Sequence, residues 1–270
     1  MIYEADNGLV YELDSLSTHH EPLRNIKRPE FTYGVHPQAL ADIVPDNRAT
    51  ILSDKATVDL LRLLDGAVMG SVRAYNDEHE LLRQAIAYTL TYKLGNDGEI
   101  YFAVYCRAKH GDGELVRRYS LGAGGHVERE DVAFYVTDNG TEVIDLTSTL
   151  VANCVREHAE EIHFPTNTQR EPRKVSRLGF VMDSGPSGYV GNVHFGVIHA
   201  IRVVADEFQM SEEQNEAVGW MRAIDLVNHD KALGEFEPWS AMIIAQIHKV
   251  CSHLRFQSYP DQGEQAAGDA

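Results

Sequence analysis

Three glutamates near the middle of the chain, Glu157, Glu160 and Glu161, have the spacing that places side chains on one face of a helix. Carboxylates so close together repel one another and destabilise the helix by some tenths of a kcal/mol for each pair. A hard divalent cation removes that penalty, because Mg²⁺ and Mn²⁺ prefer oxygen ligands. A solvated acidic face is the alternative, and the three glutamates alone favour it.

A second group of residues stands beside and upstream of these glutamates. Gly124 is followed six positions later by Glu130, and Arg156 directly precedes Glu157. This arrangement resembles the Nudix box, in which a glycine, five residues, a glutamate and seven residues lead into Arg-Glu, an apolar residue, any residue and Glu-Glu. Any residue, a glycine and an apolar residue complete that pattern, and Phe164 matches the last of these.

The flanks resemble a bacterial and phage branch of the Nudix phosphohydrolases, and the resemblance covers residues 82 to 255. The matching segments are 83–88, 119–127, 178–180 with Asp183, 193–196 and 236–240. The resemblance implies an α/β fold, the Nudix-type α/β/α sandwich around a mixed β-sheet. It also implies a pyrophosphatase-like hydrolase that uses Mg²⁺ to cut a diphosphate linkage in a nucleoside diphosphate joined to another moiety.

By the same resemblance, Glu157, Glu160 and Glu161 would hold Mg²⁺, or Mn²⁺ as a substitute, with Glu160 and Glu161 as the firmer pair. The ions would grip the diphosphate oxygens, neutralise charge on the leaving group and lower the pKa of an attacking water. A further carboxylate from outside the box often acts as ligand or general base in this family. Glu216 is the first candidate for this carboxylate, followed by Glu212, Glu213 and Glu237. For each of these glutamates, a surface position without a role in the site is the alternative.

Other box residues are expected to shape the site. Glu130 and Arg156 would form an ion pair that holds the glycine loop against the helix. Gly124 and Gly125 would let backbone approach the metal or phosphate without a Cβ in the way.

Two basic side chains are candidate substrate-binding residues. His126 follows the glycines and could contact phosphate, and a hydrogen-bonded structural imidazole is an equal alternative. Arg107, like Lys109, follows a predicted strand, where a position at a solvated edge is the alternative to a phosphate contact.

The sequence departs from the family pattern at three points. Arg156 follows Glu130 by 26 positions, where the pattern has eight. A hairpin predicted around 138–140 takes up the excess, because loop closure costs little for each added residue. His158 stands at the usual apolar position, and His163 replaces the usual glycine, so the helix is expected to end without a glycine cap.

The elements that must position these residues follow from periodicity. Strand-like runs cover 85–92, 100–106, the region near 116–120, 132–136, 141–144, 178–182 and 193–201. Helical patterns cover 53–64, 146–162, 216–228 and 239–254. Asn139-Gly140 between two strand-like runs is the strongest short-range signal for a hairpin. We expect an extension over 1–80 packed on the main domain, a Nudix-like hydrolase domain over 81–256, and a disordered tail over 257–270.

Composition limits the partners. The formal net charge of −17 opposes binding to polyanions such as long nucleic acids or acidic membranes. A small nucleotide substrate remains compatible, because bound cations reverse the sign locally, and an RNA end stays open. The three cysteines contain no CxxC pair, which argues against a zinc cluster. The sequence has no recognisable signal peptide and no membrane span, so a cytoplasmic protein is expected. The sequence does not predict whether the protein forms an oligomer.

Two alternatives from other classes remain. The first is a catalytically silent Nudix-fold nucleotide sensor or protein-binding module. The second is a purely structural acidic protein whose first 80 residues mediate assembly. If the chain is a hydrolase, ADP-ribose, NAD-like dinucleotides, nucleotide sugars, diadenosine polyphosphates and capped RNA ends are all open as substrates. Specificity is expected to lie in the N-terminal extension and the 131–145 hairpin.

Overall fold

A computed structural model gives the arrangement of most of the chain. It describes residues 2–5, 10–12, 30–41, 43–44, 48–107, 117–165, 173–183, 192–211, 215–228 and 235–258. Glu212 and Glu213, Lys109 and the tail beyond residue 258 therefore lie outside the described residues.

One large mixed sheet forms the centre, with the main strand order β16-β7-β6-β14-β13-β1-β2. The strands are β16 (Asn215–Arg222), β7 (Ile100–Arg107), β6 (Arg83–Leu94), β14 (His194–Arg202), β13 (Arg173–Met182), β1 (Ile2–Ala5) and β2 (Val10–Glu12). β6 runs parallel to β14 and antiparallel to β7. The four strands predicted over 85–92, 100–106, 178–182 and 193–201 are thereby confirmed as β6, β7, β13 and β14.

Short strands join this sheet beside the main order. They are β3 (Phe31–Val35), β4 (Arg48–Ile51), β5 (Val68–Val72), β8 (Tyr119–Ser120) and β9 (Gly122–Ala123). A separate two-stranded pair consists of β12 (Ile162–His163) and β15 (Gln209–Met210). The strand expected near 116–120 is β8.

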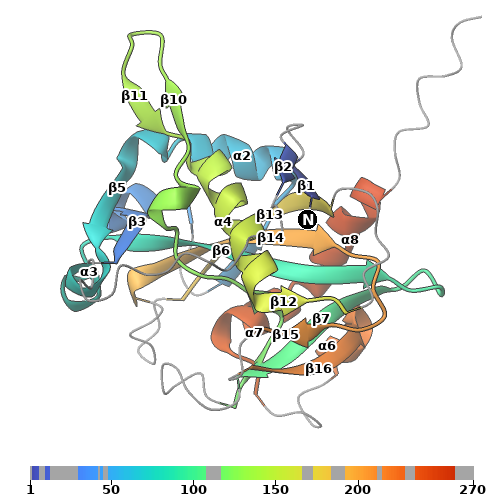
Figure 1. Cartoon of the computed structure of the whole chain (residues 1–270). Helices are drawn as coiled ribbons and strands as arrows, with labels where there is room; N and C mark the ends of the chain where they lie inside the picture. The colour runs from blue at the N-terminus through green and yellow to red at the C-terminus, as the bar shows by residue number, and fades with distance from the viewer. Residues whose placement is uncertain are drawn as a thin grey trace, which may run out of the picture.

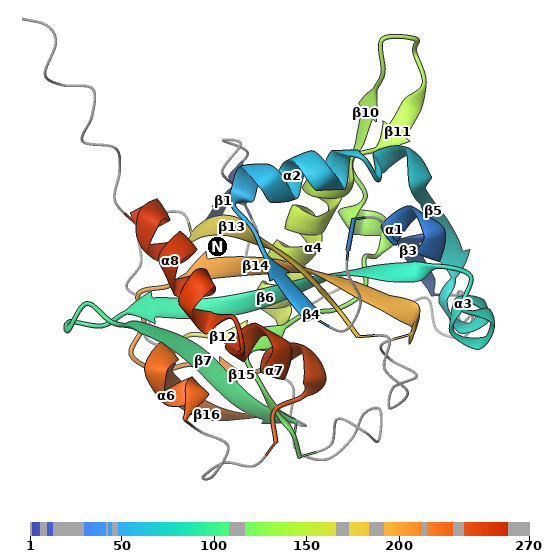
Figure 2. The same cartoon turned by 180° about the vertical axis from the view of Figure 1, so that it is seen from behind.

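Helices cover both faces of the sheet. On one face α4 (Leu146–Glu161) crosses β6, and α2 (Asp54–Arg62) lies beside it (Figure 1). On the other face lie α7 (Pro238–Ile244) and α8 (Ile247–Ser258), as Figure 2 shows. The shorter helices are α1 (Pro37–Leu40), α3 (Arg73–His79) and α6 (Ala223–Val227). The predicted α/β/α sandwich is confirmed.

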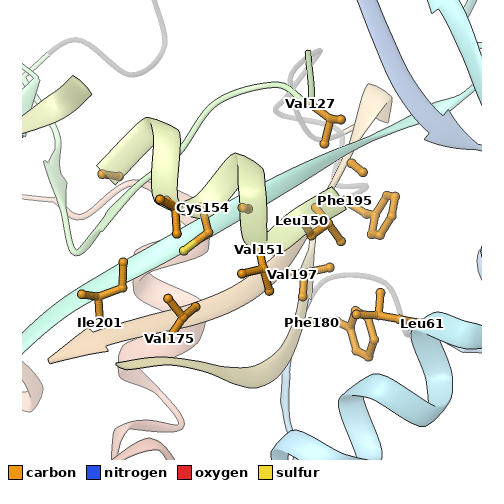
Figure 3. Packing of buried hydrophobic residues seen from close by; sticks show 14 of the residues in the cluster. Leu61, Val127, Leu150, Val151, Cys154, Val175, Phe180, Phe195, Val197 and Ile201 are labelled. Atoms are coloured by element: carbon orange, nitrogen blue, oxygen red, sulfur yellow. The ribbon is translucent and has the colours of Figure 1, made fainter. Parts of the chain in front are cut away.

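The helix α4 begins where the sequence places it. The side chain of Asp145 accepts a hydrogen bond from the Ser148 backbone N–H, which caps the first turn. Val151 and Cys154 point from α4 toward the sheet, close to Val197 on β14 (Figure 3). Each such fully buried apolar side chain contributes about 1.5–3 kcal/mol. The helix is therefore fixed against the sheet, and its last turns have a defined position.

Residues before position 80 contribute directly to the central sheet. β3 pairs with β6, and β4 pairs with β13. At the start of α2, the carboxylate of Asp54 accepts hydrogen bonds from Nε and Nη2 of Arg177 on β13, at 2.8 and 3.0 Å. The Arg177 side chain is 2% exposed. The extension is thus joined to the sheet by strand pairing and by a buried ion pair.

The predicted hairpin is confirmed as β10 (Phe134–Val136) and β11 (Glu142–Ile144). Gly140 has a φ of 81° in the turn, which favours glycine. The hairpin stands away from the body at the N-terminal end of α4 (Figure 1). Glu157 lies eleven residues after Leu146, so about 16 Å of helix separates the hairpin from the predicted site. This position does not favour the hairpin as a specificity element.

The helix predicted over 216–228 is wrong for most of its length. Residues 215–222 form β16, which pairs antiparallel with β7, with a bulge between Ala217 and Gly219, where Gly219 has a φ of 133°. Only 223–227 are helical, as α6. Glu216 and Ala217 favour a helix locally, but pairing with the edge of β7 satisfies the backbone and overrides that preference.

The helix predicted over 239–254 is present as two helices. α7 ends at Ile244 and α8 begins at Ile247. The Glu237 side chain caps α7 by accepting from the backbone N–H groups of Trp239 and Ser240. Among the described helices, none is long and apolar enough to cross a membrane.

Candidate functional site

The last turns of α4 carry two carboxylates that converge on one cationic nitrogen. Nη1 of Arg156 lies 2.9 Å from Oε1 of Glu157 and 3.1 Å from Oε2 of Glu160. The Glu157 side chain is 12% exposed and that of Glu160 is 59% exposed. The repulsion expected between these glutamates is therefore offset by the arginine of the same motif.

The glycine loop lies directly against Glu157, the buried member of this carboxylate pair. A Cβ on Gly125 would come within 2.3 Å of Oε1 of Glu157. A Cβ on Gly124 would come within 2.3 Å of the backbone oxygen of Ala87 on β6. Both distances are shorter than atoms can approach, so a side chain at Gly124 would clash with backbone, and one at Gly125 would displace the Glu157 carboxylate. Backbone of the loop and carboxylate of the helix thus share one location.

The ion pair predicted between Glu130 and Arg156 is wrong by one residue. Arg156 donates from Nη2 to Oδ2 of Asp131 at 2.8 Å and from Nε to Oδ1 at 3.0 Å. The Asp131 side chain is 3% exposed, whereas Glu130 is exposed. The reason is the register of the glycine pair: Asp131 follows Gly125 by the six positions that Glu130 follows Gly124. Asp131 is a shorter carboxylate at the place where the pattern has glutamate.

A residue that the sequence did not single out joins this network. Asn153 accepts from the Ala87 N–H of β6 and donates to the His126 backbone oxygen and to Asp131. Nη2 of Arg156 donates to the same His126 oxygen at 3.1 Å. The available signal was a polar residue, one helical turn before Arg156, among the apolar positions of the helix. Asn153 and Arg156 together hold the loop to α4 and β6.

Asp131→Ala should therefore destabilise the fold by about 2 kcal/mol, because it leaves charged and amide donors without their buried acceptor. Glu130→Ala, at the neighbouring exposed position, should change the free energy of unfolding by less than about 0.5 kcal/mol. Urea unfolding of both variants measures the difference. Equal effects at the two positions would contradict the register assigned here.

Comparisons with known proteins give the fold. No family model and no curated protein matches the chain. Among solved structures, the crystal structure of Tm1382, named as a candidate Nudix hydrolase, aligns with 82% of this chain and 99% of its own, at 20% identity and a TM-score of 0.58. This chain has the Nudix fold. The aligned share is larger than residues 81–256 alone could supply, so the likeness extends beyond the predicted hydrolase domain.

Further Nudix structures match at lower similarity. A Nudix hydrolase from Alicyclobacillus acidocaldarius has 14% identity over 61% of this chain and 90% of its own, with a TM-score of 0.41. The Nudix domain of Shewanella oneidensis NrtR, complexed with ADP ribose, has 11% identity over 66% and 99%, with a TM-score of 0.39.

The carboxylates at the end of α4 are of the chemical type that binds a divalent cation. Burial raises the pKa of the Glu157 carboxyl from 4.5 to about 7, against the lowering effect of Arg156, and Glu160 adds to the rise. A buried carboxylate of this kind is stabilised by a cation, and carboxylate oxygens are what Mg²⁺ prefers. Within the described residues no three acidic, histidine or cysteine side chains already converge. Two converge, Glu157 and Glu160, with Arg156 between them.

The raised pKa of Glu157 predicts a pH effect on stability in metal-free solution. Because the folded-state pKa lies above the unfolded one, this carboxyl stabilises the fold below about pH 4.5, and the contribution is lost as the pH rises through about 7. Between about pH 4.5 and 7 the native protein should lose up to about 1.4 kcal/mol for each pH unit relative to Glu157→Gln, and the loss should level off above pH 7. Urea unfolding with a chelator present measures both profiles, and parallel profiles would contradict the assignment.

The remaining predicted carboxylates lie in different surroundings. Glu161 is near Tyr105 and Arg107, since its charge raises the pKa of both. Glu216 is exposed and pairs in register with Cys106, so strand alternation places it on the face opposite Tyr105. Glu237 is buried as the cap of α7, where the Tyr88 hydroxyl donates to it. The structure therefore brings neither Glu216 nor Glu237 to the carboxylates of α4.

The predicted histidines have structural surroundings. Nε2 of His126 lies 2.8 Å from Nε2 of His194, so one imidazole donates to the other. Burial lowers the pKa of His126 to about 2, and His194 and Arg73 add to that effect. Burial also lowers the pKa of His158 to about 3, so His158 fills its usually apolar position as a neutral ring stacked on Phe164. The helix α4 ends at Glu161, and the residue after it, Ile162, has an extended backbone, so the helix ends without a glycine cap, as expected.

Proposed function

We infer that this protein is a Mg²⁺-dependent hydrolase that cuts the diphosphate linkage of a nucleoside diphosphate joined to another moiety. The observation that carries this is the convergence of Glu157 and Glu160 beside Gly125. Three features support it together: a buried carboxylate with a raised pKa, a second carboxylate at the same place, and a backbone loop without a side chain next to them. This combination is chemically suited to a cation and a phosphate at one location.

Each of the site residues has a distinct role in the proposed reaction. Glu157 and Glu160 would hold Mg²⁺, or Mn²⁺ in its place, and Glu161, one helical turn after Glu157, is the candidate for a third ligand. A cation held there would supply positive charge to the diphosphate oxygens and would lower the pKa of the attacking water. Asp131 and Arg156 keep the glycine loop in position against the helix, by the ion pair described above. Holding the loop rigid matters because a small misplacement of reacting groups lowers the rate strongly.

A hydrolysis screen tests the proposal. Full-length protein is incubated with ADP-ribose, NAD-like dinucleotides, nucleotide sugars, diadenosine polyphosphates and capped RNA, with Mg²⁺, with Mn²⁺ or with a chelator. We expect cleavage of at least one compound at its diphosphate, giving a nucleoside monophosphate or a phosphorylated partner, only when the metal is present. Tight nucleotide binding without metal and without cleavage would favour a nucleotide sensor instead.

A further inference from the structure

Arg107, at the end of β7, has a guanidinium group that forms no ion pair with a carboxylate among the described residues. Its Nη2 lies 3.4 Å from the Tyr105 hydroxyl, and its guanidinium carbon lies 6.0 Å from the centre of the Tyr105 ring. Nε is buried and has no hydrogen-bond partner among the described residues. An arginine offers five donors, and a buried one without an acidic partner is costly. Arg107 is therefore not the solvated residue that a strand end suggests.

Two other arginines of the described residues, Arg156 and Arg177, are paired with carboxylates. Arg156 contacts Asp131, Glu157 and Glu160. Arg177 is bound by Asp54 through both Nε and Nη2. By contrast, no carboxylate in the described part of the chain is in ion-pair contact with Arg107, which leaves its donors available for an anionic ligand.

Glu161, the last residue of α4, contributes to the electrostatic surroundings of Arg107. The pKa of Arg107 is raised chiefly by Tyr105, against the lowering effect of burial, with further contributions from Glu237, Tyr88 and Glu161. The Tyr105 hydroxyl donates to the Gly122 backbone oxygen at 2.8 Å, in the segment that leads to Gly125. The segment 122–125 therefore contacts Tyr105, beside Arg107, at one end and Glu157 at the other.

We propose that Arg107 binds the non-bridging oxygens of the substrate's diphosphate from the sheet side, opposite the carboxylates of α4. This rests on the proposed function. A diphosphate carries several negative charges, and the chain as a whole carries −17, so the substrate needs local cations. The metal supplies positive charge from the helix side. Arg107 supplies it from β7, with a planar group suited to two phosphate oxygens at once.

Binding of inorganic pyrophosphate tests the proposal without relying on turnover. Isothermal titration in Mg²⁺ compares the native full-length protein with Arg107→Ala, Arg107→Lys and Arg118→Ala. Arg118 is the control, because it is 35% exposed and faces Glu235 at 3.7 Å. We expect about 10- to 100-fold weaker binding for Arg107→Ala, an intermediate loss for Arg107→Lys, and a change of less than about threefold for Arg118→Ala.

Chemical rescue separates ligand binding from a structural role. Added guanidinium ion should restore pyrophosphate binding to Arg107→Ala and leave Arg118→Ala unchanged, because it refills the vacated space. If circular dichroism shows that Arg107→Ala does not fold, the loss of pyrophosphate affinity in Arg107→Lys is the deciding measurement. Native affinity in both Arg107 variants would overturn this inference even if the protein hydrolyses a diphosphate. A native protein that neither binds pyrophosphate nor hydrolyses any compound would overturn the proposed function as well.

Discussion

Glu160→Gln should lower Mg²⁺-dependent hydrolysis by about 10²- to 10³-fold, or abolish it, while the fold remains intact. The substitution keeps the size of the side chain and removes the negative charge that would hold the cation. Because Glu160 is 59% exposed, its contact with Arg156 contributes little to stability, and the free energy of unfolding should change by less than about 1 kcal/mol. Initial rates on the best substrate of the screen, with circular dichroism, measure both.

Glu142→Gln is the matched control for this experiment. It makes the same chemical change at an exposed position on the β10–β11 hairpin, at the other end of α4. Its rate should equal that of the native protein within about twofold. Retained activity in Glu160→Gln, or an equal loss in Glu142→Gln, would count against a metal role for the helix carboxylates.

Asp54→Ala should destabilise the protein by about 3–5 kcal/mol. The substitution removes the carboxylate that accepts from the Arg177 backbone N–H, Nε and Nη2, and leaves an uncompensated charge in the interior. Because total stabilities of domains are about 5–15 kcal/mol, this is a large share. Urea unfolding at constant pH measures the change.

Asp59→Ala on the same helix controls for the loss of a carboxylate. Asp59 pairs with Lys55, and both side chains are more than half exposed. Such a pair contributes about 0.3–0.5 kcal/mol, so the variant should remain close to the native protein. If Asp54→Ala were equally mild, the expectation that residues 1–80 are an extension fixed to the main domain would lose its energetic support.

The parts of the fold that the sequence predicts well are those with a strong local signal. The helix beginning at Leu146 has a capping Asp145 and apolar residues at helical spacing, and both features are local. The Asn139-Gly140 turn likewise determines its hairpin through two adjacent residues. In these elements the local preference and the tertiary structure agree.

The elements that the sequence misjudged depend on distant partners. β16 is a strand because β7, more than a hundred residues earlier, offers an edge to pair with. The Asp54–Arg177 pair joins residues 123 positions apart, and no local pattern indicates it. Burial of Arg107 depends on the fold around the end of β7, so its residue type alone suggested a solvated position.

The sequence identifies the helix that carries the candidate site, but it does not identify the carboxylate that pairs with Arg156. Three glutamates after an arginine identify the helix, because their spacing is set by the helix itself. The ion-pair partner of Arg156 lies across a hairpin, where counting from Gly124 or Gly125 gives Glu130 or Asp131. Only the structure distinguishes them, by burying Asp131 and leaving Glu130 exposed.

A crystal of the full-length protein soaked in Mn²⁺ tests the central proposal most directly, because the anomalous signal of manganese locates the ion without assumptions about the substrate. We expect a peak coordinated by carboxylate oxygens of Glu157 and Glu160, next to the Gly124–Gly125 loop. A map without manganese at that place, with Arg156 still binding both carboxylates, would contradict the metal-dependent mechanism.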